Sequence, residues 1–209
     1  MSDSALNDGQ REVLQMFFAL PESKGFVLAG GAGLIAVGLS ARLTEDLDLF
    51  TCAASIAEAA DALEEAAGRR GWLVERIDDA STFRRVVLGL DGGQQVRVDL
   101  ARDAGPLSAP RVTAVGPTYP PDELAARKVL ALFDRAALRD FVDVATVARI
   151  FGRERLLGLA HEIDAGFDRQ VFGDMVRTLG RFKDEELAEL AVDPAGLREF
   201  FSTWLPELS

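Results

Sequence analysis

The stretch FVLAGGAGLIAVGLSARLTEDLDLF, residues 26–50, constrains the fold of this chain more than any other segment. An apolar, strand-like run ends in Gly30 and Gly31, and an apolar helix-like segment follows it. A second strand-like run then carries Asp46 and Asp48, two residues apart. This order predicts a small mixed α/β unit in which the acidic residues lie at fixed positions on a strand.

The two aspartates are expected on one face of their strand, together with Phe50, because side chains alternate between faces. Leu47 and Leu49 then lie on the other face. Carboxylates about 6–7 Å apart repel each other by roughly 0.6 kcal/mol in water, and by several-fold more in a cleft. A divalent cation between them turns that repulsion into a binding site, so the spacing indicates magnesium and phosphate chemistry.

Composition limits the class of protein. At 209 residues, 48% of them hydrophobic, the chain can form one large domain or two small ones. Its 23 basic and 34 acidic residues give a net charge of −11, which disfavours non-specific binding to duplex DNA. A basic cleft on an acidic body stays open, because arginines gather in one segment: Arg69, Arg70, Arg76, Arg84, Arg85, Arg97 and Arg102.

Nothing in the sequence predicts export or membrane insertion. The apolar stretch 26–39 is too short to span a bilayer, and the polar, acidic amino end lacks the pattern of a signal peptide. Cys52 is the only cysteine, so an intrachain disulfide is excluded. We therefore expect a cytoplasmic protein that does not bind membranes.

The hydrophobic periodicity divides the chain into a mixed part and a helical part. In the first part we expect helices at 7–20, 31–42 and 55–70, and strands at 26–29, 46–50, 72–77, 83–90, 95–101 and 111–115. Asp91-Gly92-Gly93 predicts a hairpin turn between two of these strands. The second part predicts helices at 122–133, 138–151, 153–163, 170–179, 185–190 and 195–205.

The fold class is therefore α+β, a small mixed β-sheet core with flanking helices followed by a carboxy-terminal helical bundle. The Gly- and Pro-rich segment 105–121 is the expected boundary. It divides the chain into an α/β core, residues 1–116, and a helical domain, residues 117–209.

A third carboxylate is expected to join the acidic pair. In QVRVDLA, residues 95–101, Arg97 and Asp99 share one strand face, and the valines share the other. If this strand neighbours residues 46–50, three carboxylates converge. Magnesium takes oxygen ligands and commonly binds through a few carboxylates plus substrate phosphates.

The glycine pair suits phosphate binding. Gly30 and Gly31 fall between a strand and a helix, where backbone N–H groups and the helix amino terminus can hold a phosphate. Alone, the pair is better explained as a tight turn, and the Asp-x-Asp alone as a solvated strand edge. The combination at this spacing favours a functional site.

These residues resemble a known family. The glycine pair, the apolar helix and R-x-T-x-D-L-D are similar to the first motif of nucleotidyltransferases of the DNA polymerase β type, and more narrowly to the AbiEii/AbiGii toxin family. The resemblance continues in V-R-V-D-L, in Lys128 of ARKVLAL and in RDFVDV, residues 139–144. Many members have Gly-Ser where this chain has Gly30 and Gly31.

The resemblance implies a metal-binding set and a nucleotide-binding set. Asp46 and Asp48 would bind magnesium, and Asp99 would be the third carboxylate, placed to help activate the acceptor hydroxyl. Gly30 and Gly31 would contact the nucleotide phosphates.

The helical part is implied to supply further site residues. Lys128 would hold the nucleotide phosphates as a mobile cation, and Arg139 fits a phosphate contact through its planar fork. Asp140 or Asp143 would orient Lys128 or the incoming base. The alternatives are a surface ion pair between Arg139 and Asp143, four residues apart on a helix, and a solvated Lys128. Arg42 and Thr44, ahead of the acidic strand, are expected to brace the loop.

The activity implied is magnesium-dependent transfer of a nucleoside monophosphate from an NTP to the 3′ end of tRNA, with release of pyrophosphate. The protein would act as the toxin of a toxin–antitoxin pair, with a cognate antitoxin as partner, and would block translation. Two alternatives remain: transfer to a small-molecule hydroxyl such as that of an aminoglycoside, and a non-catalytic nucleotide-binding module of the same fold.

Overall fold

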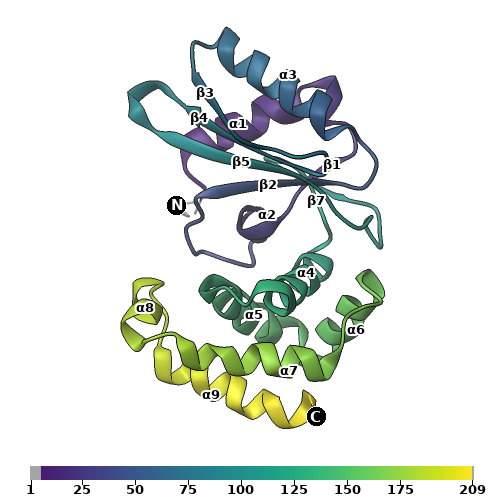
Figure 1. The fold of residues 1–209 in the computed structure, drawn as a ribbon, viewed down its shortest axis with the longest axis vertical. Helices are drawn as coiled ribbons and strands as arrows, with labels where there is room; N and C mark the ends of the chain where they lie inside the picture. The colour runs from purple at the N-terminus through teal and green to yellow at the C-terminus, as the bar shows by residue number, and fades with distance from the viewer. Residues whose placement is uncertain (1–5, 209) are drawn as a thin grey trace. The chain divides into compact units, whose positions relative to one another are not determined.

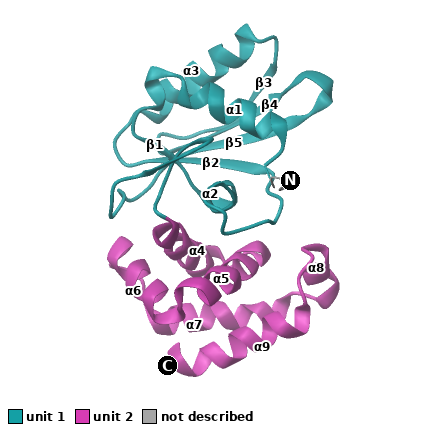
Figure 2. Ribbon diagram, turned by 180° about the vertical axis from the view of Figure 1, so that it is seen from behind, with its two compact units in different colours: residues 1–120 teal, residues 121–209 magenta. Residues whose placement is uncertain are grey.

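A computed structural model describes residues 6–208 of the chain. These residues form two compact units, divided between Pro120 and Pro121, which Figure 2 shows in different colours. The mixed part and the helical part expected from the periodicity correspond to these two units. The first unit extends past residue 116, because the strand Gly116–Thr118 belongs to its sheet.

The first unit is built on a mixed sheet (Figure 1). In the described residues the sheet has seven strands in the order β3-β4-β5-β2-β1-β7-β6. The pairs β2–β5 and β1–β7 are parallel, and the other pairs are antiparallel. The strands are β1 (Phe26–Leu28), β2 (Asp46–Thr51), β3 (Leu73–Asp79), β4 (Phe83–Gly89), β5 (Gln95–Arg102), β6 (Arg111–Thr113) and β7 (Gly116–Thr118).

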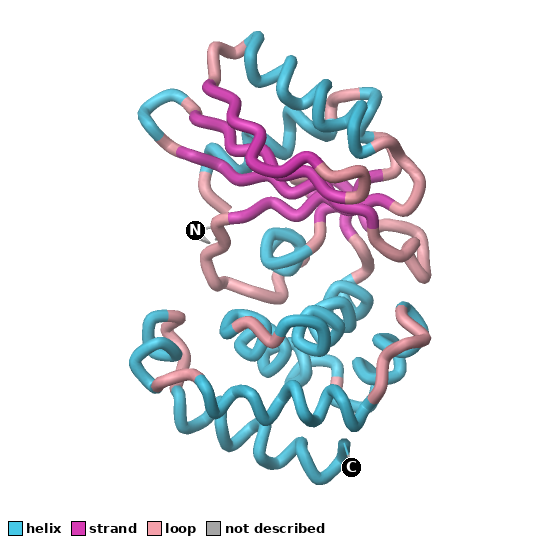
Figure 3. The backbone as a smooth tube through the Cα atoms, in the orientation of Figure 1, coloured by secondary structure: helices cyan, strands magenta, loops and turns pink. Residues whose placement is uncertain are grey.

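Two helices cover one face of this sheet. Helices α1 (Asp8–Phe18) and α3 (Ile56–Arg69) lie on that face, and α2 (Gly30–Ala36) lies on the other (Figures 1 and 3). The helices and the sheet share one apolar core, because alternate strand residues point toward the helices. Its fully buried members include Val13, Phe17, Leu47, Leu49, Leu63, Val86, Val98 and Leu100.

The strands expected from the sequence are confirmed, and two details differ. The strand β7 was not predicted; it has only three residues, one of them proline, and lacks an alternating pattern. Helix α2 ends at Ala36 rather than at residue 42. Its end is set by Gly38, which takes the left-handed conformation at φ 78° while its N–H donates to the Ile35 carbonyl.

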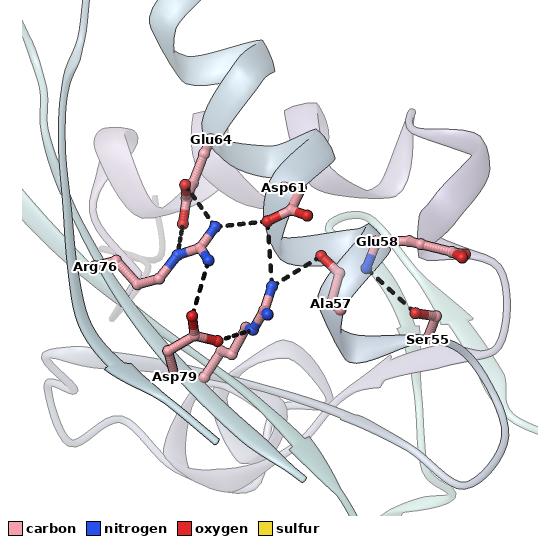
Figure 4. A network of polar contacts seen from close by, with 8 residues as sticks. Ser55, Ala57, Glu58, Asp61, Glu64, Arg76 and Asp79 are labelled. Atoms are coloured by element: carbon pink, nitrogen blue, oxygen red, sulfur yellow. Dashed lines mark hydrogen bonds and ion pairs between the residues drawn. The ribbon is translucent and has the colours of Figure 1, made fainter. Parts of the chain in front are cut away.

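Arginine ion pairs tie the edge of the sheet to helix α3 (Figure 4). Arg76 of β3 donates to Glu64, Asp61 and Asp79, and these hydrogen bonds, that of Glu64 first, raise its pKa above the ordinary arginine value. Arg84 of β4 also bonds Asp61, and it pairs with Asp79. Two strands and a helix are thus joined by charges on the helix-covered side of the sheet.

The second unit is helical. Its helices are α4 (Pro121–Arg135), α5 (Leu138–Phe151), α6 (Arg153–Ile163), α7 (Arg169–Arg177), α8 (Asp184–Glu189) and α9 (Pro194–Trp204). Phe141 and Phe201 meet edge to face with ring centroids 5.4 Å apart, and Trp204 packs edge to face against Phe172 at 5.5 Å. This aromatic cluster gives the unit its own core. None of the described helices is long and apolar enough to cross a membrane.

We expect Leu49→Ala to destabilise the first unit by about 2–5 kcal/mol, because it leaves a cavity in a fully buried part of β2. Leu73→Ala is the matched control, since Leu73 is 79% exposed on β3; it should cost less than about 1 kcal/mol. Urea unfolding followed by the fluorescence of Trp72, in a Trp204→Phe background, measures both. Equal losses in the two variants would contradict this description of the core.

Candidate active site

Three carboxylates lie on the sheet face that α1 and α3 leave uncovered. Strands β2 and β5 lie side by side and parallel, with Asp48 opposite Asp99 and Asp46 opposite Arg97. Neighbouring residues of paired strands point to the same side, so all four side chains share one face. The expected pairing of these two strands is confirmed, and it places Asp46, Asp48 and Asp99 on one face of the sheet.

The apolar partners on these strands explain why the carboxylates face outward. Leu47, Leu49 and Val98 are fully buried on the opposite side. A shift of one residue would place the carboxylates in the core and the leucines on the polar face, so burial fixes the register. Asp46 and Asp99 are each only 6% exposed, which makes them buried charges that need partners.

Arginines supply those partners. Arg85 of β4 donates from Nε and Nη2 to the two oxygens of Asp99, at 2.7 and 2.6 Å. Arg97 of β5 donates from Nη1 to Asp46 Oδ1 at 2.8 Å. The hydrogen bonds to Asp99, followed by the charges of Asp99, Asp46 and Asp78, raise the pKa of Arg85 above its ordinary value. The face therefore holds positive charge against its carboxylates.

The glycine pair lies directly beside Asp48. Gly30 has φ 57°, and a Cβ at this position would overlap the Asp48 carboxylate. Only glycine therefore meets both the backbone and the space requirement here. Gly30 begins helix α2, whose cap residue Ala29 gives the first turn no side-chain hydrogen bond. The backbone N–H groups of a first helical turn carry partial positive charge, which favours an anion at that helix end.

The loop ahead of the acidic strand packs on the second glycine. A Cβ at Gly31 would lie 3.0 Å from Thr44 Oγ1 and 3.4 Å from Arg42 Nη2. Arg42 also donates to the Leu43 carbonyl at 2.9 Å. Gln10 of α1, which is 2% exposed, donates to the Thr44 carbonyl at 2.7 Å. The expected bracing role of Arg42 and Thr44 agrees with these contacts, and Gln10 is an additional brace.

The helical unit contains a buried lysine–carboxylate pair. Lys128 of α4 and Asp143 of α5 lie 2.9 Å apart, with side chains 8% and 2% exposed. Such a pair is costly to desolvate and is often retained for a specific role. On the same helix Arg127 pairs with Glu123 at 2.9 Å, also buried. The alternative of a solvated Lys128 is therefore wrong.

The two candidate aspartates of α5 have different partners. Asp140 is fully buried, and Arg135, at the end of α4, donates to it from Nε and Nη2 at 2.9 and 3.1 Å. This pair spans the short turn between the helices, with the acid at a helix start and the base at a helix end, as the helix dipoles favour. Of the two, Asp143 contacts Lys128. Arg139 lies exposed on the same helix.

Sequence reasoning missed the partners of the carboxylates. Arg85 was noted only as one of a group of arginines, because its face depends on the register of the β4–β5 hairpin. Arg97 could have been found, since it shares a strand face with Asp99 at a spacing of two residues. Gln10 offered no signal, because its partner lies 34 residues away in the sequence.

The donor set suits a hard divalent cation. Three carboxylates on neighbouring strands offer the oxygen ligands that Mg²⁺ takes, and the missing side chain of Gly30 makes room for the Asp48 carboxylate. As the side chains lie, however, Asp46 and Asp99 turn to arginines. Among residues 6–208, no group of three or more His, Cys, Asp or Glu side chains is arranged to hold a metal ion.

The fold defines the class of protein. JHP933 from Helicobacter pylori superimposes with a TM-score of 0.64 at 16% identity, covering 100% of this chain and 93% of the other. A structure described as a putative nucleotidyltransferase from H. pylori gives 0.58 at 18% identity, covering 100% and 99%. MenT4, a nucleotidyltransferase toxin from Mycobacterium tuberculosis, gives 0.62 at 15% identity, covering 96% and 82%. At these identities the likeness establishes a nucleotidyltransferase fold.

The family follows from the sequence itself. The model of the family described as "Nucleotidyl transferase AbiEii toxin, Type IV TA system" matches residues 12–206. The chain belongs to this family of nucleotidyltransferase toxins, which act on NTPs and are paired with antitoxins. No curated protein matches the chain. The resemblance identified from the motifs is confirmed.

We expect Gly30→Ala to destabilise the first unit by about 1–3 kcal/mol, because its Cβ meets the Asp48 carboxylate and its backbone stays left-handed. Gly68→Ala is the control: Gly68 lies in α3 with open space around it, and alanine there should add up to about 1 kcal/mol. Thermal unfolding of both variants measures the difference. A loss of stability in Gly30→Ala with a gain in Gly68→Ala supports the close approach at Gly30. A stability change of the same sign in both variants contradicts it.

Proposed function

We propose that this nucleotidyltransferase moves a nucleoside monophosphate from an NTP to the 3′ end of tRNA with the help of Mg²⁺, and so blocks translation. The observation that supports it best is the register of β2 and β5, which sets Asp48 beside Asp99 with Asp46 on the same face. Phosphoryl-type transfer requires charge neutralisation and alignment more than covalent help from the protein. A carboxylate face next to a glycine turn suits that requirement.

In this proposal each candidate site residue of the first unit has a role. Asp46, Asp48 and Asp99 hold Mg²⁺, which offsets the charge of the triphosphate oxygens when it is bound. The amino end of α2, at Gly30 and Gly31, binds the phosphates through backbone N–H groups. Because Gly31 has no side chain, that contact involves no serine hydroxyl.

The transfer step forms one bond to phosphorus and breaks another. The acceptor hydroxyl oxygen forms a bond to the α-phosphorus of the NTP, and the bond from that phosphorus to the bridging oxygen of the β-phosphate breaks. Pyrophosphate leaves with the bond electrons, and Asp99 takes the hydroxyl proton or orients it toward water. Asp99 suits this role because it lies beside Asp48 on the same face of the sheet.

The proposal also gives Lys128 a role with the nucleotide. A lysine is a compact, mobile cation, so it can follow the phosphates as charge shifts to pyrophosphate. Asp143 orients it, which the 2.9 Å contact supports. Asp140 closes the turn between α4 and α5 through Arg135.

The tRNA acceptor is supported by membership of a toxin family and by chemistry. The 3′-terminal ribose of tRNA carries the hydroxyl that must be free for aminoacylation, so a nucleotide added there stops charging. The net charge of −11 favours a small cationic acceptor instead, and an aminoglycoside is therefore the competing substrate to test.

We expect wild type to transfer label from α-³²P NTPs to total tRNA in the presence of Mg²⁺, and Asp48→Asn to lose at least about a hundredfold in rate. Asp61→Asn is the control, since Asp61 lies on α3 in the arginine network and away from the carboxylate face. It should keep transfer within about twofold. Label that moves only to an aminoglycoside would replace the tRNA proposal, and label in neither acceptor would refute both.

A neutral double variant tests the role of Lys128. Removing one partner alone would leave a buried charge, at a cost of about 3–5 kcal/mol, so we pair Lys128→Gln with Asp143→Asn. We expect this protein to fold, as urea unfolding checks, and to lose at least about tenfold in transfer rate. The control is Lys183→Gln at an exposed position of the helical unit. A folded double variant with full activity would rule Lys128 out of the reaction.

A further inference from the structure

The carboxylates of Asp46 and Asp99 each carry a cation that belongs to the chain. The fork of Arg85 occupies both oxygens of Asp99, at 2.7 and 2.6 Å, and Arg97 occupies Asp46 Oδ1 at 2.8 Å. A metal ion that takes Asp99 as a ligand needs at least one of those oxygens. The arginine and the ion therefore compete for the same atoms.

We infer that Arg85 is a positioning residue that exchanges places with the divalent ion on Asp99. Without metal, its guanidinium neutralises the buried carboxylate; on metal binding it releases at least one oxygen. Arg97 donates to one oxygen of Asp46, Oδ1. This inference deepens the proposed function and rests on it.

The burial of the two partners determines which one moves. The side chain of Asp99 is 8% exposed and that of Arg85 is 36% exposed. Turning the carboxylate away would bury an unpaired charge, whereas the guanidinium can swing outward through its longer, partly solvated side chain. It also has a second contact, because it lies 5.4 Å from the ring centroid of Phe83. The carboxylate stays in place and the arginine moves.

Release of Arg85 from Asp99 makes its guanidinium available for a second contact. Once its fork leaves Asp99, the guanidinium remains beside the carboxylate face, where the triphosphate is proposed to bind. A guanidinium fork matches phosphate oxygens as well as it matches a carboxylate. Metal and nucleotide loading are then coupled, because the ion releases the donor that the phosphates can take.

The strand itself provides a matched control. Arg84 precedes Arg85 on β4, so its side chain points to the opposite face, where it pairs with Asp61 and Asp79. Arg84→Gln removes one arginine from the same strand without touching the carboxylate face. Any difference from Arg85→Gln reports on the contact with Asp99.

The test is calorimetric titration of the full chain with Mn²⁺, without nucleotide or acceptor. We expect Arg85→Gln to bind Mn²⁺ about tenfold more tightly than wild type, the factor for one charge-assisted pair that no longer competes. Arg84→Gln should match wild type. In an Asp99→Asn background, Arg85→Gln should change the affinity by less than about twofold.

Thermal unfolding with and without Mn²⁺ gives an independent measure. We expect the metal to raise the Tm of Arg85→Gln more than that of wild type, because the ion restores the charge balance that the variant lost. Arg85→Lys retains the charge without the fork and should bind with intermediate affinity.

The outcomes separate this inference from the proposed function. Unchanged or weaker Mn²⁺ binding by Arg85→Gln, alongside normal transfer by wild type, overturns the exchange and leaves the activity standing. Tighter binding by Arg85→Gln in a protein that transfers nothing supports the exchange and removes the proposed reaction. Absence of Mn²⁺ binding in wild type and in every variant overturns the inference and the magnesium proposal together.

Discussion

The parallel pairing of β2 with β5 is the interaction on which the candidate site depends. One face of the pair buries leucines and valines against α1 and α3, and this burial fixes the register. The same register sets Asp46, Asp48 and Asp99 together on the other face. Apolar packing on one side of the sheet thus assembles the charges on the other side, against their mutual repulsion. The arginines of β4 and β5 offset that repulsion.

Much of this arrangement could be predicted from the sequence, because it follows from period-two alternation. Aspartate alternates with leucine in β2, and charged residues alternate with valine in β5. This alternation alone predicts the sheet face of each side chain, without knowledge of which strands pair. The partner of Asp99 could not be found this way, because Arg84 and Arg85 are adjacent and only the hairpin register decides which one faces the carboxylates. The end of α2 was misjudged for a similar reason. An apolar run continues past Ala36, but Gly38 in a left-handed conformation ends the helix.

The helical unit shows the limit of reasoning from spacing along one helix. Asp140 and Asp143 are both acidic positions of α5, and the spacing of Arg139 and Asp143 suggested a surface ion pair. Contacts between helices distinguish the two aspartates: Asp143 lies against Lys128, and Asp140 lies against Arg135. Which partner a charged residue takes depends on how α4 and α5 pack, and that packing is not encoded in the spacing within either helix.

The outermost strand of the sheet has a consequence for assembly. β3 exposes Leu73 and Ile77, and its outer backbone could template a strand from another molecule. Two features oppose such addition. A register shift between Arg76 and Asp78 increases the local twist of the strand, and the strand LVERIDD is rich in charged side chains. The irregular register and the charged side chains of β3 therefore disfavour edge-to-edge pairing with another molecule at this border of the sheet.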